Sequence, residues 1–540
     1  MAAGRGISRR RLLAAGGAAA VGVAAGGARA ARRNPPPKRK PVEFTHGVAS
    51  GDPLSDRVIL WTRAVARRGR RSRIRWQVAS DERLRRIVAE GSATARRRND
   101  WTVKVDATGL EPGRTYWYRF TAPRSRSPIG RTRTAPAGSP KSVRLAVLTC
   151  ADYSRGLYNA YARVAERDDI DAVLHLGDYI YEGFREDRVR RHDPPTEVRT
   201  RRQYRRRYAS YRSDPALASL HARHPMIWVW DDHETCDGTW RDGADPSNHD
   251  PEEDGPFGAR KRAALRAALE WLPIRSPEQG NRERIYRRFA FGDLIDLFMI
   301  DTRRIGRDRQ GEPNVEGGFF TQTGEFADPE RQILGAAQEE WLYSGLRSSA
   351  AAWRLIGNQV VLSHIKVVPG PAAAPTTVYA NPDQWDGYRP AQERLLDVLG
   401  ELDDVVVLTG DVHASMAFEI TPDPNNPAVY DPATSRGTVA VELVTPSISS
   451  AGDPQAPEDA EGVVESILLQ NSSALSGPNP HLKYADAARN GYLLVDVDRE
   501  RVRAEFWLVP TVTRQTDEQA LDRAFTVRRG EARLTGQPDS

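Results

Sequence analysis

The chain has few of the residues that cross-link a small secreted fold or hold a protein in a membrane. It contains two cysteines among 540 residues, Cys150 and Cys236, which excludes a disulfide framework. Beyond the first thirty residues, no apolar run approaches the roughly 20 residues of a membrane-spanning helix. We therefore expect a globular chain, long enough for two or more domains. A single disulfide between the two cysteines is an open alternative if the protein is exported to an oxidising compartment.

Acidic residues are absent from the beginning of the chain. Residues 1–30 hold five Arg and no Asp or Glu, and residues 31–41 add five Arg or Lys in a Pro-rich linker. Residues 42–540 carry 69 basic and 72 acidic groups, a net charge of −3. We therefore assign the overall charge of +7 to the leader and linker, and we expect no specific nucleic-acid binding.

The leader, residues 1–30, has the features of a twin-arginine export signal. The run Ser8-Arg9-Arg10-Arg11-Leu12-Leu13 precedes an Ala- and Gly-rich, weakly apolar stretch, and Ala28-Arg29-Ala30 resembles a cleavage site. The alternative, a transmembrane anchor, would need a longer and less Gly-rich segment. We expect the folded chain to pass through the twin-arginine translocase. It would then be secreted or lie in the cell envelope or periplasm, with no transmembrane segment after removal of the signal.

Residues 42–136 lack a predicted helix of core-forming length. Short apolar runs separated by turns predict strands at 44–50, 58–62, 74–80, 101–106 and 116–121. The segment 110–118 resembles the tyrosine corner of immunoglobulin-like and fibronectin type III domains, with Tyr116 or Tyr118 as the corner residue. We expect an all-β sandwich domain here.

The sequence pattern changes after Pro136. Strands predicted at 143–149 and 170–176 flank a helical stretch in which Leu157, Tyr161 and Val164 share one face, which indicates a βαβ unit. Further strands are predicted at 294–300, 353–363, 405–409 and 438–444, and helices at 258–272, 337–348 and 391–400. A strand pair at 491–497 and 502–509 is expected at the edge of a second sheet, and residues 512–540 are expected to form a tail. The Arg- and Tyr-rich segment 196–224 is interpreted as a solvated helix face rather than a nucleic-acid surface.

Potential metal ligands follow four predicted strands. They are Cys150 after the first strand, Asp178 and Tyr181 after the second, Asp232 and His233 after the third, and Asp411 and His413 after the fourth. Because ligands gather outside the carboxyl ends of strands in open α/β sheets, we expect these side chains to meet. Thiolate and phenolate suit Fe or Zn, and carboxylates suit Ca, Mg or Mn. The pattern predicts two unlike metal sites that share one acid.

The motifs around these residues resemble the PhoD family of alkaline phosphatases, in the calcineurin-like metallophosphoesterase superfamily. They are Thr149-Cys150, Gly177-Asp178-Tyr179-Ile180-Tyr181, Trp230-Asp231-Asp232-His233-Glu234, Gly357-Asn358-Gln359, Gly410-Asp411-Val412-His413 and the opening segment 44–53. The resemblance extends from about residue 42 to the C-terminus. It implies an α/β (α+β) metallophosphoesterase core over 140–511, with a two-sheet sandwich flanked by helices, preceded by the β domain.

The resemblance also implies cofactors, a reaction and site residues. The ferric ion would be held by Cys150, Asp178, Tyr181 and His413, and one or two calcium ions by Asp232, Asp411, Asn358 and the bridging Asp178. His233 would be the catalytic residue that donates a hydrogen bond or a proton. The expected reaction is hydrolysis of small or polymeric phosphate monoesters, with diesters as a second class, for phosphate acquisition. A metal-bound hydroxide or oxo group would attack in line, without a covalent intermediate.

Some neighbouring residues have a structural interpretation, and two other functions are alternatives. Asp231, Cys236 and His364 are expected to be structural, and the sequence 235–240 departs from the family pattern. A phosphodiesterase or phospholipase D-like hydrolase is the alternative enzyme, and a non-catalytic envelope binding protein is the alternative outside enzymes. We expect a monomer.

Overall fold

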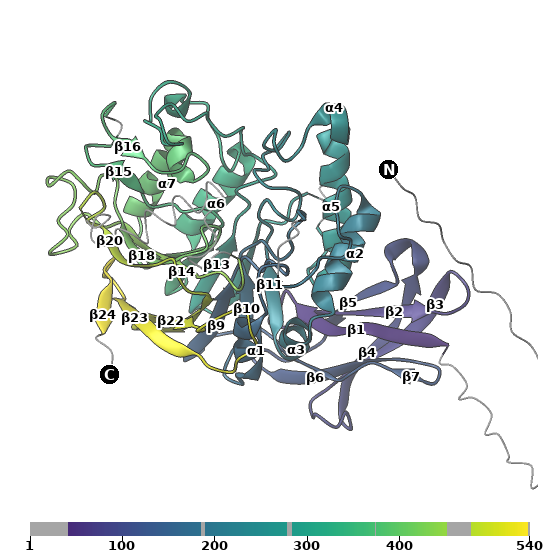
Figure 1. The fold of residues 1–540 in the computed structure, drawn as a ribbon. Coiled ribbons are helices and arrows are strands. Elements are labelled where there is room, and N and C mark those ends of the chain that lie inside the picture. The colour runs from purple at the N-terminus through teal and green to yellow at the C-terminus, as the bar shows by residue number, and fades with distance from the viewer. Residues whose placement is uncertain (1–40, 185–188, 278–282, 373, 451–476, 538–540) are drawn as a thin grey trace, which may run out of the picture. The chain divides into compact units, whose positions relative to one another are not determined.

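The computed structural model describes residues 41–184, 189–277, 283–372, 374–450 and 477–537 (Figure 1). The predicted export signal, and all but the last residue of the predicted linker, lie outside the described residues. No helix in the described part of the chain combines the length and the apolarity that a bilayer crossing requires.

Residues 42–136 form the predicted all-β part. One sheet contains β1 (Val42–Gly51), β2 (Arg57–Ala66) and β5 (Thr102–Thr108), and the other contains β4 (Ile87–Arg96), β3 (Arg71–Ala79), β6 (Thr115–Ala122), β7 (Ser125–Arg126) and β8 (Gly130–Arg133). Buried side chains such as Leu60, Val78 and Phe120 fill the space between them. Tyr116 is the corner residue, because its hydroxyl accepts a 2.8 Å hydrogen bond from the backbone N–H of Glu111. The sequence did not predict β4, which is largely exposed and rich in Ala, Ser and Gly.

The largest sheet continues from this β part into the rest of the chain. Its order is β24-β23-β22-β21-β9-β10-β11-β1-β2-β5, where the new strands are β9 (Ser142–Leu148), β10 (Ala172–His175), β11 (Pro225–Trp228), β21 (Gly491–Asp498), β22 (Arg501–Leu508), β23 (Ala520–Arg528) and β24 (Thr535–Gln537). The join is a short parallel pairing between β1 and β11.

Two expectations about the C-terminal region are corrected. The strand pair β21 and β22 does not add to the second sheet, because β21 pairs antiparallel with β9. The segment 512–540 contains β23 and β24, which extend the same sheet. The choice between two sheets depends on which edge is free, and local sequence carries no information on that.

A second sheet packs against the first. Its order is β12-β13-β14-β17-β19-β18-β20, with β12 (Arg287–Phe291), β13 (Ile295–Met299), β14 (Trp353–Gly357), β17 (Val405–Thr409), β19 (Ala440–Val444), β18 (Ser415–Ile420) and β20 (Leu482–Asp486). One apolar core contains Leu145 and Leu174 of the first sheet together with Leu355 and Leu443 of the second. The predicted strand 353–363 ends at Gly357, and a separate hairpin of β15 (Lys366–Val368) and β16 (Val378–Tyr379) follows.

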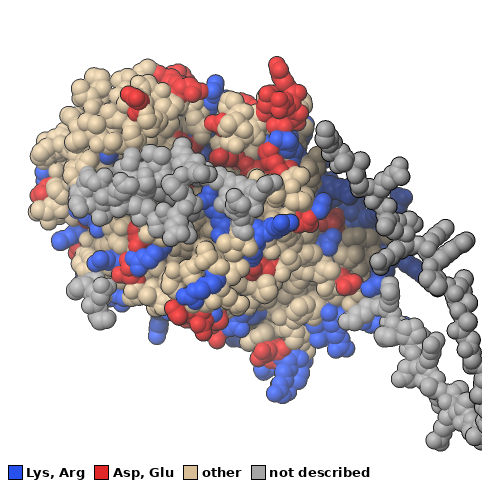
Figure 2. Space-filling model, viewed as in Figure 1, with Lys and Arg blue, Asp and Glu red and all other residues tan. Residues whose placement is uncertain are grey.

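Helices cover these sheets (Figure 1). They are α1 (Asn159–Glu166), α2 (Arg201–Arg212), α3 (Pro215–Arg223), α4 (Pro251–Asp254), α5 (Phe257–Trp271), α6 (Ala336–Ser348) and α7 (Arg389–Gly400), with 3-10 turns η1 (Arg97–Asn99), η2 (Gly324–Ala327) and η3 (Trp385–Tyr388). The helices predicted at 258–272, 337–348 and 391–400 are confirmed within two residues. Acidic side chains gather over α4 at the top of the view (Figure 2).

The Arg- and Tyr-rich segment is not simply a solvated helix face. In α2, Arg207 and Arg212 are fully buried. Arg207 donates hydrogen bonds to the carbonyl oxygens of Tyr181 and, at 2.9 Å, of Gly183. The guanidinium of Arg212 lies 4.2 Å from the centre of the Trp61 ring. Buried loop carbonyls need donors, and a guanidinium offers five, so this helix braces the loop that follows β10.

Candidate metal centre

The carboxyl ends of strands from both sheets meet at one place. The strands β9, β10 and β11 are parallel neighbours in the first sheet, and β17 lies in the second. The residues that follow these strands form three groups whose ligand atoms lie within 4.8 Å of one another. The groups are Cys150 with Asp178 and His413, Asp178 with Asp232 and His233, and Asp231 with Asp232 and Asp411. The structure therefore brings together side chains that the sequence separates by more than 260 positions.

The backbone at these strand ends is strained. Cys150, Asp178, Asp411 and His413 have φ angles of 53°, 54°, 67° and 55°, in the left-handed region. Such conformations cost about 1–3 kcal/mol each and concentrate at functional sites. Before Asp178 stands Gly177, with a φ of 116°, where a Cβ would lie 2.4 Å from the Cβ of Asp231. Local chain energetics would not select this geometry, so the surrounding fold imposes it.

The first group of donors has the spacing expected around a single ion. The Tyr181 hydroxyl donates to Asp178 Oδ2 at 3.0 Å, and it lies 3.1 Å from His413 Nε2. The Cys150 sulfur lies 3.7 Å from Asp178 Oδ2. When several ligand atoms bind one ion, each about 2.0–2.3 Å from it, the separations between those atoms are like the ones measured here. Ser450, which the sequence did not indicate, donates a 2.7 Å hydrogen bond to the Tyr181 oxygen.

A buried arginine offsets part of the negative charge of Asp231, Asp232 and Asp411. Arg303 is fully buried, and its Nη2 lies 2.6 Å from Asp411 Oδ1 and 3.7 Å from Asp232 Oδ2. Its Nε contacts Asp231, and its Nη1 lies 2.7 Å from Asp383. Arg303 is thus an ion-pair partner of the acids. The neighbouring Arg304 lies over the Trp230 ring, and its guanidinium carbon is 4.1 Å from the ring centre.

The electrostatics of the protein atoms favour a bound cation. Burial raises the pKa of the Cys150 thiol well above its ordinary value, and the negative charge of Asp178 raises it further. Burial also raises the pKa of Asp178 and, against the opposing effect of Arg303, brings the pKa of Asp411 to about 6. One arginine does not offset the acids around it. Because a cation stabilises the deprotonated forms of all these donors, the residues present fit a metal site.

His233 faces a cavity beside this cluster. The cavity has a volume of about 740 Å³, and its lining includes Tyr181, Asp232, His233, Asp411 and His413. Burial opposes protonation of His233, but Asp178 and Glu182 outweigh burial and raise its pKa well above the ordinary value. The ring also lies against the ring of Tyr181, with 4.0 Å between ring centres and an angle of 32° between the planes. His233 is therefore held where a reacting group in the cavity would meet it.

Glu182 and Glu234 had no role in the sequence-based prediction. In the structure they position His233 and the backbone of Asp178 and Asp231. Glu182 Oε2 lies 2.8 Å from His233 Nδ1, while its Oε1 accepts from the Asp237 backbone N–H at 2.8 Å. Glu234 accepts from the backbone N–H groups of Asp178 and Asp231, at 3.1 and 2.8 Å. Both glutamates stand beside predicted ligands in the sequence, at 182 and 234, which was the available signal.

The loop that departs from the family pattern acts through its backbone. Besides Asp237, it supplies the backbone N–H of Gly238, which donates to Asp232 Oδ2 at 2.8 Å. Cys236 is buried against Ala244 and Phe257, apart from the three donor groups. Both cysteines are free, so the alternative of a disulfide is wrong, and the structural interpretation of Cys236 is confirmed.

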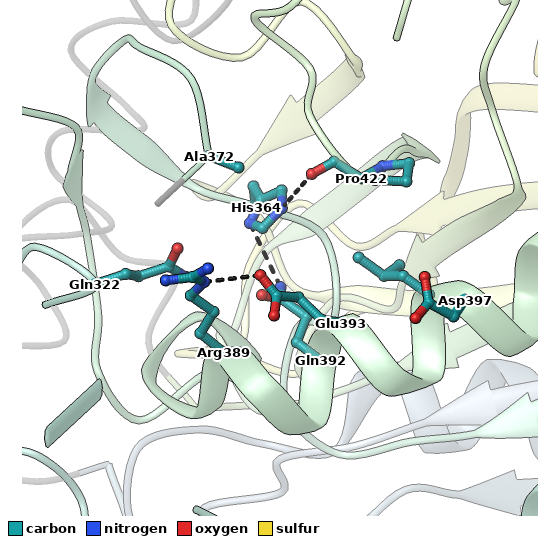
Figure 3. A pocket seen from close by; sticks show the side chains of 9 residues that line it. Gln322, His364, Ala372, Arg389, Gln392, Glu393, Asp397 and Pro422 are labelled. Atoms are coloured by element: carbon teal, nitrogen blue, oxygen red, sulfur yellow. Dashed lines mark hydrogen bonds and ion pairs between the residues drawn. The ribbon is translucent and has the colours of Figure 1, made fainter. Parts of the chain in front are cut away.

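Two further residues that the sequence singled out make other contacts. The side-chain amide of Asn358 donates to Val360 and Thr409 and accepts from Trp385 Nε1 at 3.3 Å, and its role as a calcium ligand stays a prediction. His364 lines a separate small cavity of about 100 Å³ (Figure 3). Its Nδ1 lies 2.6 Å from Asp386 and its Nε2 lies 3.2 Å from the Pro422 carbonyl, as expected for a structural histidine.

Fold and site together describe a two-sheet α/β core that gathers buried groups able to hold metal ions. Residues 145–506 match the PhoD-like phosphatase family, and residues 28–136 match the PhoD-like phosphatase N-terminal domain. The chain is 35% identical over 492 residues to alkaline phosphatase D of Bacillus subtilis strain 168, covering 87% of this chain and 78% of the relative. A solved structure described as PhoD superposes with a TM-score of 0.80 at 32% identity and covers 92% of both chains. The chain therefore belongs to the PhoD-like phosphatase family.

Proposed function

We propose that this phosphatase hydrolyses phosphate monoesters with one ferric ion and one or two calcium ions. The observation that carries the proposal is the sharing of Asp178 between two donor groups of different chemistry beside one cavity. Thiol, phenol and imidazole in the first group suit iron, and the carboxylates of the second suit calcium. When bound, such ions supply Lewis-acid stabilisation of phosphoryl oxygens and an activated water.

The chain's own residues would have distinct roles in this reaction. Cys150, Tyr181 and His413 would hold iron, Asp232 and Asp411 would hold calcium, and Asp178 would contact both. His233 would donate a hydrogen bond or a proton to the leaving oxygen, while Glu182 fixes its ring through Nδ1. The Nε2 atom is then the one left to meet a substrate.

Matched substrates and a chelator test this assignment. Release of p-nitrophenol from mono- and bis-p-nitrophenyl phosphate should favour the monoester, and removal of calcium should abolish that release. Elemental analysis of the purified protein should find iron and calcium. Activity on the diester alone would support the phosphodiesterase alternative, and no activity with both metals present would support a binding protein.

We also propose that the chain is exported by the twin-arginine translocase as a folded, metal-loaded protein. The support is the sequence of the leader, since paired Arg before a weakly apolar stretch is the signal for that route. Replacement of Arg9 and Arg10 by Lys should retain the protein in the cytoplasm. Immunoblots of cell fractions would measure this, and unchanged export of the variant would contradict the proposal.

A further inference from the structure

The near-neutral charge of residues 42–540 conceals two parts of opposite sign. Residues 42–136 contain 21 Arg or Lys and nine Asp or Glu, whereas residues 137–540 contain 48 and 63. The leader and linker still account for the net charge of the whole chain, but the β part carries a second basic excess that the acidic remainder offsets. Basic side chains lie over β2 and β3 at the right of the view (Figure 2). The β part carries this positive charge although it is not the part that carries the metal centre.

Six of these arginines share the outward face of one sheet. In β3, Arg71, Arg73 and Arg75 are exposed and alternate with residues that include the buried Ile74. Paired residues on neighbouring strands point to the same side of a sheet. The strand register places Arg96 opposite Arg71, Arg119 opposite Gln77, and Arg126 opposite Thr121, which is itself paired with Arg75. We name Arg71, Arg73, Arg75, Arg96, Arg119 and Arg126 the arginine face.

Little negative charge accompanies the arginine face. The acid in register with it is Glu90, which lies opposite Gln77 and accepts a 3.1 Å hydrogen bond from that side chain. None of the six arginines forms an ion pair with a carboxylate of another described residue; Arg73, for example, donates to the Ser92 hydroxyl. Burial and the neighbouring Arg126 lower the pKa of Arg119. Unpaired like charges repel one another, and an anionic partner would remove that cost.

Exposed apolar side chains lie in the same β part as these arginines. Ile87, Val88 and Ile129 are 37%, 46% and 40% exposed. Ile87 pairs with Ala79, and Ala79 pairs with Trp117. This row of the sheet is separated from the row that contains Arg119 by the row of Val78 and Tyr118. A soluble polyanion offers phosphates to arginines but no apolar phase to the aliphatic residues. A lipid surface offers both, because headgroups and acyl chains meet there.

We propose that the arginine face docks this enzyme on an anionic phospholipid bilayer, with Ile87, Val88 and Ile129 entering the headgroup region. Each arginine near such a surface strengthens partitioning by roughly fivefold. The metal centre is not part of this contact, since it stands at the strand ends of the α/β core. Docking is therefore separable from hydrolysis, and an exported enzyme would meet the outer surface of a membrane.

Vesicle co-sedimentation of the full chain tests the proposal. The probes are vesicles of phosphatidylcholine alone and of phosphatidylcholine with about one third phosphatidylglycerol, a strongly anionic surface. The variant replaces Arg71, Arg73 and Arg75 by Gln. The matched control replaces Arg202, Arg262 and Arg266 by Gln, because these arginines are also exposed but lie on α2 and α5. All three proteins carry the same leader, so a difference in vesicle binding between them is due to the arginine face.

The wild type and the control should bind the anionic vesicles, and the arginine-face variant should partition roughly a hundredfold more weakly. Vesicle binding should weaken as the salt concentration rises. The double substitution Ile87→Ser and Val88→Ser should reduce the vesicle binding that persists at high salt. All proteins should hydrolyse p-nitrophenyl phosphate equally. Equal vesicle binding by variant and wild type would overturn the proposal. So would equal binding to neutral vesicles, or binding to single-stranded DNA without binding to vesicles.

Discussion

At the scale of single residues, the two thiols have opposite surroundings. Cys150 stands 3.7 Å from a shared carboxylate, whereas Cys236 is packed among apolar side chains. Replacing Cys150 by Ser should weaken metal affinity by on the order of 10–100-fold or more, because a ligand counts for at least as much as an outer-shell partner. Iron content and the visible absorption of the purified protein would measure the loss.

Cys236→Ser is the matched control for that substitution. Its thiol contacts Thr239 rather than a ligand group, so metal content and rate should stay near those of the wild type. If Cys236→Ser lost the metal and Cys150→Ser kept it, the assignment of the two thiols would be inverted.

His233 can be distinguished from a metal ligand by experiment. His233→Gln should lower kcat by on the order of 10²–10⁴, the usual contribution of a positioned acid or base, while the metal content stays unchanged. Glu182→Gln should have a smaller effect on kcat, since it loosens the ring without removing it. Loss of metal from the His233 variant would show instead that its imidazole completes the group with Asp178 and Asp232.

At the scale of elements, helix α2 supports the loop that carries Tyr181. Arg207→Leu removes donors from several buried carbonyl groups and should lower the free energy of unfolding by about 3 kcal/mol. Arg206→Leu, one position away on the same helix, breaks an exposed ion pair with Asp193 and should cost less than about 1 kcal/mol. Urea denaturation of both variants would measure the difference. Equal losses would mean that Arg207 does not brace the loop.

The elements also show how far local sequence pattern reaches. The strand predicted at 405–409 and the helix predicted at 337–348 agree with β17 and α6 within one residue, because both have strong apolar periodicity. The strand β4 was missed because its residues face solvent and lack that signal. Helix α2 was misinterpreted because charge in a sequence does not reveal whether buried carbonyls will surround it.

At the scale of the whole molecule, buried histidines should make stability depend on pH. Burial lowers the pKa of His46 and His175 to about 3 and of His224 to about 4, from about 6.5 in an unfolded chain. As pH falls below 6.5, the unfolded chain therefore takes up protons that the folded chain does not. The stability that is complete above pH 6.5 is lost on acidification, at about 2 kcal/mol per histidine by pH 5.

Denaturation at pH 7.5 and 5 would measure this loss. His175→Gln should remove about a third of the decrease due to these three residues. Tyr161→Phe, which deletes the hydroxyl 2.7 Å from His175 Nε2, should lower stability at both pH values but leave the pH dependence intact. An unchanged slope in His175→Gln would contradict the assignment.

The sequence by itself determined the type of the elements that have strong apolar periodicity and the ligand residue types that follow four of the strands. It did so because apolar periodicity and strand-end chemistry are local properties. The tertiary structure decided which edge of which sheet received β21, and it alone joined β1 to β11. It also placed Arg303 among the acids, because that position depends on contacts between distant segments. The basic face of β3 likewise required the strand register, since a charge count over 42–540 averages it away.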